Sequence, residues 1–177
     1  MNGKLAAALS PVVDELVKQG NAVDSPTYAK MADQVAKAFQ AGTDEVAILS
    51  LDEQGKFLNF IIPEKLQKVG NIPLSSTTAL AARTARDRRA EVINNFTTAK
   101  HITVFEAVPL GQQRGDPIQK IMSAPIMLEN KIIGVIQVSR KGKAVTAVGP
   151  DFTSADLNEL VAAGNMIGRC LKLGSGS

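Results

Sequence analysis

The chain has 177 residues, which is long enough for one domain with a sizeable core. Its formal charge of only +3 and its few aromatic residues argue against nucleic-acid binding, and its single cysteine and single histidine exclude a disulfide framework and a conventional structural zinc site. No apolar run is long enough to cross a bilayer and the N-terminus lacks a signal-peptide pattern, so we expect a cytoplasmic protein.

Two amphipathic helices are predicted at the start of the chain. The first covers residues 4–19, and Pro11 predicts a kink or a second start within it. The second begins with Ser25 as its N-cap and Pro26 at its first helical position, and Gly42 ends it. The apolar stripes of the two helices consist of Leu5, Leu9, Val12 and Leu16, and of Tyr28, Met31, Val35 and Phe39.

The middle of the chain predicts short strands and one short helix. Residues 46–51 and 56–62 are apolar runs on either side of a polar turn, and each predicts a strand. A serine at 75–76 is the expected cap of a short helix, and residues 90–93 predict another brief strand. Residues 97–117 combine one or two expected helical turns with a polar loop.

The most informative stretch is 120–143, which predicts a β-hairpin. Two runs rich in isoleucine and valine, 121–128 and 132–139, flank the polar break Glu129-Asn130-Lys131. Both runs are apolar on both faces over most of their length. We therefore expect them in the middle of a sheet that is covered on both sides.

The last helix has the clearest start signal in the chain. Thr153 and Asp156 predict a capping box, and Phe152 precedes them as a hydrophobic staple. The closing residues 174–177, Gly-Ser-Gly-Ser, are expected to be a flexible tail. The apolar stripe of the helix comprises Leu157, Leu160, Val161, Gly164, Ile167 and Leu171.

Taken in order, several strings of this sequence resemble the GAF domain family. VAILSLDEQGK (46–56) resembles the first strand and turn of that family, and SAPI (123–126) with KIIGVI (131–136) resembles its most recognisable hairpin. FTSADL (152–157) is similar to the start of its closing helix. The helix after Ile72-Pro73-Leu74 and the strand Glu91-Val92-Ile93-Asn94 also match in order, so the resemblance covers roughly 25–173.

The resemblance implies an α+β, α/β/α-layered fold with a central antiparallel sheet of about six strands. The terminal helices would cover one face, and short helices and loops would lie over a ligand pocket on the other. It divides the chain into an N-terminal helical extension (1–22), a GAF-like domain (23–173) and the tail (174–177). Family members commonly serve as sensory or regulatory modules, and many form homodimers through their terminal helices.

Three specialised activities of the family do not match this sequence. The charged signature of cyclic-nucleotide-binding members has no counterpart here, and bilin-binding relatives use a cysteine in the middle of the domain, whereas Cys170 lies in the last helix. Relatives that reduce free methionine sulfoxide use several cysteines, and one cysteine cannot form an intramolecular disulfide. The sequence does not identify a cofactor.

The resulting expectation is a non-enzymatic module that binds a small organic ligand of unknown identity. Apolar contacts would give the fit, Arg83 would recognise an anion or amide, and Asn94 and Ser123 would form hydrogen bonds. A structural dimerisation module without a ligand, and a small enzyme that uses His101 as acid or base, are the alternatives. The arginine cluster Arg83, Arg86, Arg88 and Arg89 is either a solvated surface or an anion site, with nucleic acid as a weaker candidate. The predicted ligand contacts are Phe60, Leu80, Arg83, Asn94, Phe105 and Ser123.

Overall fold

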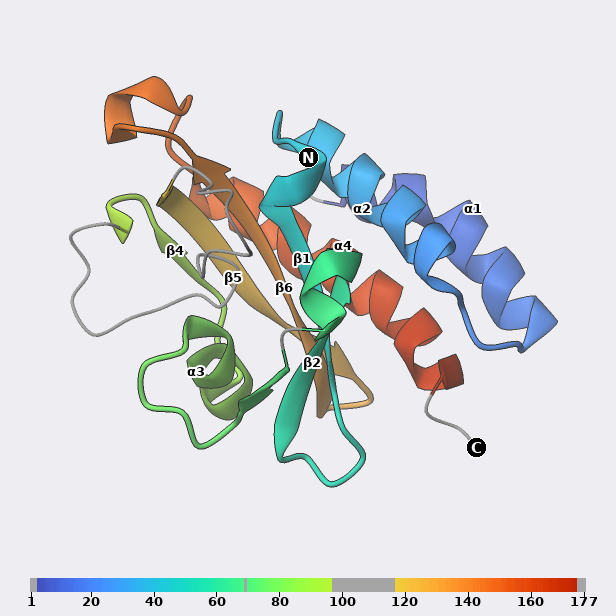
Figure 1. The fold of residues 1–177 in the computed structure, drawn as a ribbon. Helices are drawn as coiled ribbons and strands as arrows, with labels where there is room; N and C mark the ends of the chain where they lie inside the picture. The colour runs from blue at the N-terminus through green and yellow to red at the C-terminus, as the bar shows by residue number, and fades with distance from the viewer. Residues whose placement is uncertain (1–2, 69, 97–116, 175–177) are drawn as a thin grey trace.

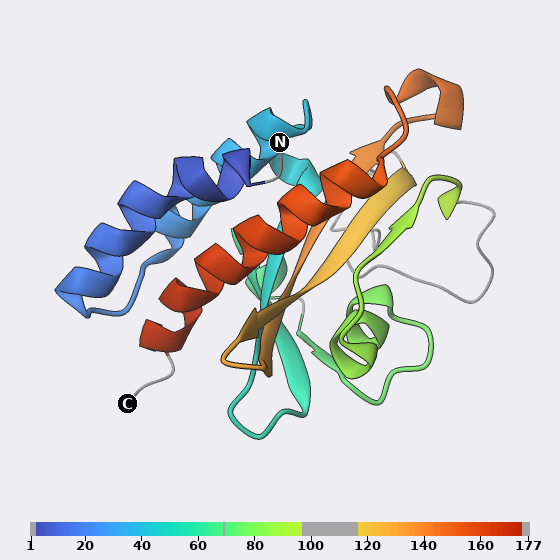
Figure 2. The ribbon, with the colours of Figure 1, turned by 180° about the vertical axis from the view of Figure 1, so that it is seen from behind.

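The fold is a sheet between two layers of helices and loops, in a computed structural model that describes residues 3–68, 70–96 and 117–174. One six-stranded antiparallel sheet carries α1 (Lys4–Gln19), α2 (Ser25–Ala38) and α4 (Ser154–Gly174) on one face, and α3 (Leu80–Asp87) on the other (Figure 1). Seen from behind, α1 and α4 run side by side across the sheet (Figure 2). The predicted layered α+β fold is confirmed.

The predicted hairpin lies in the interior of the sheet, as expected from its apolar faces. The strand order is β3-β2-β1-β6-β5-β4, so β5 and β6 have neighbours on both sides. Glu129 and Asn130 form the two-residue loop between them with φ values of 53° and 66°, as a type I′ turn requires. The strands are β1 (Val46–Leu51), β2 (Phe57–Ile62), β3 (Asn71–Pro73), β4 (Glu91–Ile93), β5 (Ile118–Leu128) and β6 (Lys131–Lys141).

The short edge strand β3 was not predicted from the sequence. It has three residues and ends at Pro73, which has no N–H to donate to a ladder. Its pairing with β2 is therefore a consequence of the tertiary fold, which brings residues 71–73 beside residues 57–59.

The helix α1 differs from its prediction in two respects. It is continuous through Pro11 rather than restarted there. Leu5 and Leu9 of the predicted stripe are buried and Leu16 packs against the same cluster, but Val13 is buried in place of Val12, which remains 38% exposed. The buried residues of α1 join the same apolar cluster as those of α2, α4 and the sheet.

Two carboxylates attach α1 to the rest of the molecule. Glu159 of α4 accepts hydrogen bonds from the first backbone N–H groups of α1, at 2.6 Å from Gly3 and 3.1 Å from Leu5. These N–H groups have no partner within the helix, so a carboxylate from α4 caps the N-terminus of α1. The carboxylate of Asp14, on α1 itself, accepts a hydrogen bond from Nη1 of Arg169 on α4 at 2.8 Å.

Two of the three predicted helix caps are shifted. Asp24, rather than Ser25, is the N-cap of α2, because its Oδ1 accepts the N–H of Thr27 at 3.1 Å. Helix α3 begins only at Leu80, because Ser76 accepts the N–H of Ala79 within the preceding turn. The capping box of α4 is confirmed by the bonds from Thr153 N–H to Asp156 and from Asp156 N–H to Thr153, at 2.9 and 3.1 Å.

Candidate functional site

Two of the predicted ligand contacts, Phe60 and Leu80, lie on the α3 side of the sheet. Phe60 of β2 packs in an apolar cluster with the alanines of α3 and with leucines of β1 and β2. Leu80 belongs to a second cluster with Phe96, Ile118 and Ile121. Both side chains are buried, so they form part of the packing between the sheet and α3.

A buried polar network lies on the same side, between β5, β6 and α3. Ser123 and Gln137 are paired directly across β5 and β6, and Gln137 Nε2 donates to Ser123 Oγ at 3.1 Å. Ser123 Oγ is 2.7 Å from Thr84 Oγ1, which itself donates to the carbonyl of Leu80 at 2.9 Å. Because Thr84 donates its hydroxyl proton to the carbonyl of Leu80, Ser123 must be the donor in the bond to Thr84. The hydroxyl of Ser123 therefore donates to Thr84 and accepts from Gln137.

The amide of Gln137 is only partly engaged by this network. Its side chain is 3% exposed, and one N–H is used on Ser123. Within the described residues, its carbonyl oxygen accepts no hydrogen bond. A buried amide oxygen without a partner is energetically unfavourable by about 1–3 kcal/mol, so this group is a candidate point of recognition.

Arg83 lies at the edge of this region and already has a carboxylate partner. Its Nε and Nη2 donate to the two oxygens of Glu91 at 3.0 and 2.8 Å, in a bidentate pair that links α3 to β4. Arg86 donates to the backbone carbonyls of Leu74 and Ser76. Two arginines of the predicted cluster therefore attach α3 to neighbouring segments.

Asn94 forms a two-way contact with the backbone of Phe152. Its Oδ1 accepts the N–H of Phe152 at 2.9 Å, and its Nδ2 donates to the carbonyl of the same residue at 3.0 Å. The amide thus joins the end of β4 to the segment that leads into α4. This geometry gives Asn94 a structural contact that the sequence did not predict.

The structure brings together only some of the predicted site residues. Phe60, Leu80 and Ser123 share the α3 side, with Arg83 at its edge, whereas Asn94 contacts Phe152. Phe105 and His101 lie outside the described residues. Thr84 and Gln137 were not predicted. Gln137 carries a detectable signal, because it is a polar residue inside the apolar run of β6.

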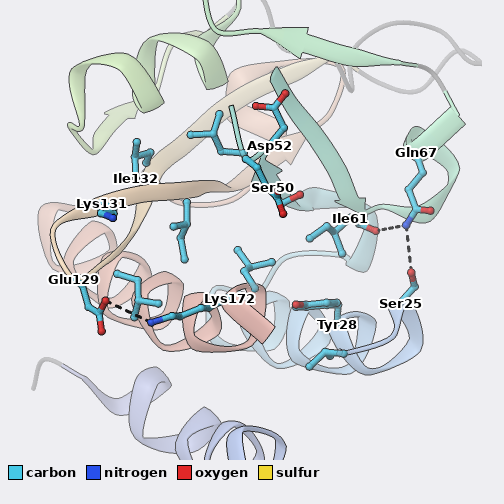
Figure 3. A pocket seen from close by; sticks show the side chains of 16 residues that line it. Ser25, Tyr28, Ser50, Asp52, Ile61, Gln67, Glu129, Lys131, Ile132 and Lys172 are labelled. Carbon is cyan, nitrogen blue, oxygen red and sulfur yellow. Dashed lines mark hydrogen bonds and ion pairs between the residues drawn. The ribbon is translucent and has the colours of Figure 1, made fainter. Parts of the chain in front are cut away.

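The described residues also form a cleft of about 820 Å³ on the opposite, helix-covered side of the sheet (Figure 3). It lies between the first turn of α2, the last turns of α4, and the β1–β2 and β5–β6 turns. Tyr28 points its hydroxyl into this space, and burial raises the pKa of that hydroxyl above its usual range. None of the five predicted contacts that the structure describes lines this cleft.

Several kinds of site find no support in the part of the chain that is described. There, no group of three histidine, cysteine, aspartate or glutamate side chains lies together as metal ligands, and no helix is long and apolar enough to cross a membrane. Cys170 is buried, and burial raises the pKa of its thiol, so the reactive thiolate is disfavoured.

Comparisons with known proteins agree on one fold. A family model described as GAF domain matches residues 26–171. The chain is similar to the GAF domain of phosphoenolpyruvate-protein phosphotransferase from Acinetobacter, with 18% identity and a TM-score of 0.68 over 97% of this chain and 95% of that one. No sequence among the curated proteins matches.

Two further solved structures carry the same fold in different proteins. Free methionine-R-sulfoxide reductase from Neisseria meningitidis, solved with its substrate, has 11% identity and a TM-score of 0.62 over 99% of this chain and 95% of that one. The GAF-B domain of DevS from Mycobacterium smegmatis has 13% identity and a TM-score of 0.55 over 86% and 96% of the two chains. At these identities the likeness concerns the fold alone.

Proposed function

This chain belongs to the GAF domain family, and we propose that it binds a small organic molecule between the sheet and α3 as a sensory or regulatory module. Domains of this family are generally small-molecule-binding sensory or regulatory modules, and most of them are not catalytic. The observation that carries the proposal for this chain is the buried amide of Gln137, whose carbonyl oxygen accepts no hydrogen bond from the residues that the structure describes.

In this proposal, the ligand donates a hydrogen bond to the carbonyl oxygen of Gln137. Ser123 and Thr84 act as positioning residues, because their hydrogen-bonded chain to the carbonyl of Leu80 fixes the orientation of the amide. A pre-oriented amide in a dry environment discriminates strongly between ligands with and without a donor.

The other predicted contacts could take part in binding, but Arg83 and Asn94 would first have to give up the partners that they have in the structure. Phe60, Leu80 and Phe105 would shape the apolar wall. Arg83 would bind a ligand anion only by exchanging its bidentate partner Glu91. Asn94 would contact a ligand only by releasing the backbone of Phe152.

A thermal-shift screen against a library of metabolites tests this proposal. A compound that binds only the native protein stabilises it by about 2.7 kcal/mol at a concentration of 100 times its Kd, so genuine ligands raise the melting temperature. Gln137→Met should abolish these shifts, because it keeps the length of the side chain and removes the amide. Gln119→Met is the matched control, since Gln119 is equally buried but donates to the carbonyl of Gly142 at 2.8 Å, away from the network.

Two outcomes of the screen would contradict the proposal. If no compound raises the melting temperature at millimolar concentration, the alternative of a structural module without ligand is favoured. If ligands stabilise Gln137→Met as much as wild type, binding takes place elsewhere.

We also propose a homodimer through the terminal helices, with residues 1–22 as the extension that supplies the contact. The apolar residues of α1 that face α4 are buried within the chain, so the available surface is its outer strip of Ala8, Pro11 and Val12. Sedimentation velocity of wild type and Val12→Glu tests this point. A dimer that persists unchanged in Val12→Glu would exclude the strip as the interface.

The proposal does not include catalysis. The reductase from Neisseria meningitidis shares the fold, but this chain has one cysteine, Cys170, and it is buried. We expect no reduction of free methionine sulfoxide, as measured by release of methionine. Any turnover that is found and then lost in His101→Gln would favour the enzyme alternative. The cytoplasmic location stays a prediction.

A further inference from the structure

A cleft on the helix-covered side of the sheet has the properties of a second binding site. Its lining residues Tyr28, Ile61 and Leu171 belong to the apolar cluster on the side of α2 and α4. Leu51 and Ile132 line its other end and pack against the cluster on the α3 side, and Gln137 does not line the cleft. Its volume of about 820 Å³ lies in the range of small-molecule sites. The inference made from it does not depend on the function proposed above.

Close packing at Gly134 positions one wall of the cleft. Ser50 of β1 is paired with Gly134 of β6. A Cβ atom at Gly134 would lie 2.3 Å from the carbonyl oxygen of Leu49 and 3.2 Å from Cδ1 of Leu171. The glycine therefore lets the last turn of α4 approach the sheet closely, so that Leu171 lines the cleft beside Ser50.

The most informative side chain in the cleft is Tyr28. It is 5% exposed, and Figure 3 shows its hydroxyl directed into the cleft. Within the described residues, this hydroxyl has no hydrogen-bond partner, although buried tyrosine hydroxyls usually have one. A tyrosine hydroxyl is protonated at neutral pH, and burial raises its pKa further, so it is available as a donor.

The surroundings of this hydroxyl favour an uncharged ligand. The inner walls are the apolar side chains of Val23, Ile61, Ile133 and Leu171. Five charged side chains also line the cleft, and four of them are exposed: Glu53, Glu129, Lys131 and Lys172. Lys172 pairs with Glu129 at 3.5 Å, and the half-buried Asp52 accepts the backbone N–H of Lys56 at 2.8 Å. At the other end, Gln67 donates to the carbonyl of Ile61 at 2.8 Å and thereby ties the loop after β2 to the cleft (Figure 3).

We propose that this cleft binds a small neutral molecule with a compact apolar body and a carbonyl or ether oxygen. The body packs against Ile61, Ile133 and Leu171, and the oxygen accepts a hydrogen bond from Tyr28 Oη. Such a molecule gives the hydroxyl the partner that it lacks among the described residues, and it brings no charge into the apolar interior. It also bridges α2, α4 and the sheet.

Methyl NMR on protein labelled at the isoleucine δ1 carbons tests this proposal with two probes of equal shape. Cyclohexanone carries the acceptor, and methylenecyclohexane replaces it with a carbon. Each probe should change the methyl chemical shifts of Ile61 and Ile133 in a saturable way. The methyl chemical shifts of Ile118 and Ile121, which lie on the α3 side, should not change at lower probe concentrations than these. The isoleucine spectrum thus distinguishes this cleft from the site of the proposed function.

The variant Tyr28→Phe removes only the hydroxyl and keeps the ring. The ratio of the affinities for cyclohexanone and for methylenecyclohexane should fall about three- to tenfold in this variant, which corresponds to one hydrogen bond. Val23→Phe, which places a ring in the cleft, should abolish binding of both probes while Tyr28 is retained.

Three results would overturn the proposal. The first is the lack of saturable shifts at Ile61 and Ile133 with either probe. The second is an unchanged affinity ratio in Tyr28→Phe. The third is a titration in which only Ile118 and Ile121 shift, which would instead support a site on the α3 side and leave the cleft without a ligand.

Discussion

The replacement Asn94→Ala separates a structural role of Asn94 from a role in ligand binding. The wild-type side chain forms two hydrogen bonds with the backbone of Phe152, at 2.9 and 3.0 Å, and both are partly buried. A net contribution of about 1 kcal/mol for each bond predicts a loss of about 2 kcal/mol in the free energy of unfolding. For a chain of this length, that loss lowers the melting temperature by about 4–8 °C.

Urea unfolding of the ligand-free protein, followed by circular dichroism, measures this effect. The midpoint should fall while the m-value stays unchanged, since the surface exposed on unfolding is the same. Asn59→Ala is the matched control, because Asn59 is exposed on β2 and none of its side-chain atoms shows a hydrogen bond to the described residues. If Asn94→Ala destabilises the protein no more than Asn59→Ala does, the contact with Phe152 contributes little and this reasoning is refuted.

Three further predictions concern packing, pH and the thiol. Gly134→Ala should lower the free energy of unfolding by about 1–3 kcal/mol in urea, because its Cβ would lie 2.3 Å from the carbonyl oxygen of Leu49; an unchanged midpoint would contradict this. Hydrogen bonds from the backbone N–H groups of Leu5 and its neighbours hold the pKa of Glu159 below its usual 4.5. The stability that these bonds give to the folded state is therefore present above pH 4.5 and is lost as the pH falls through the folded pKa. The protection factors of the α1 amides against hydrogen exchange, which correct for the slower intrinsic exchange in acid, should therefore fall as the pH is lowered, and Glu159→Gln should remove that pH dependence. The buried thiol of Cys170 should react with a chromogenic disulfide reagent only in denaturant, and rapid reaction of the native protein would refute its burial.

The sequence predicted those features of the fold that depend on local patterns. The apolar runs 121–128 and 132–139 with a two-residue polar loop predicted the central hairpin, because side chains alternate across a strand and both faces were apolar. Thr153 and Asp156 predicted the start of α4, because a capping box needs only residues three positions apart. The order of these elements was enough to indicate the family.

Only the tertiary structure decided what the polar side chains contact. The partner of Asn94 is 58 residues away in the sequence, and that of Ser123 in α3 is 39 residues away. The cleft beside Tyr28 is likewise assembled from two helix ends and two turns that are distant along the chain. Hydrogen-bond partners and cavities depend on distances between segments, whereas periodicity and caps depend on neighbours along the chain, and so the sequence determined the layers but not the sites.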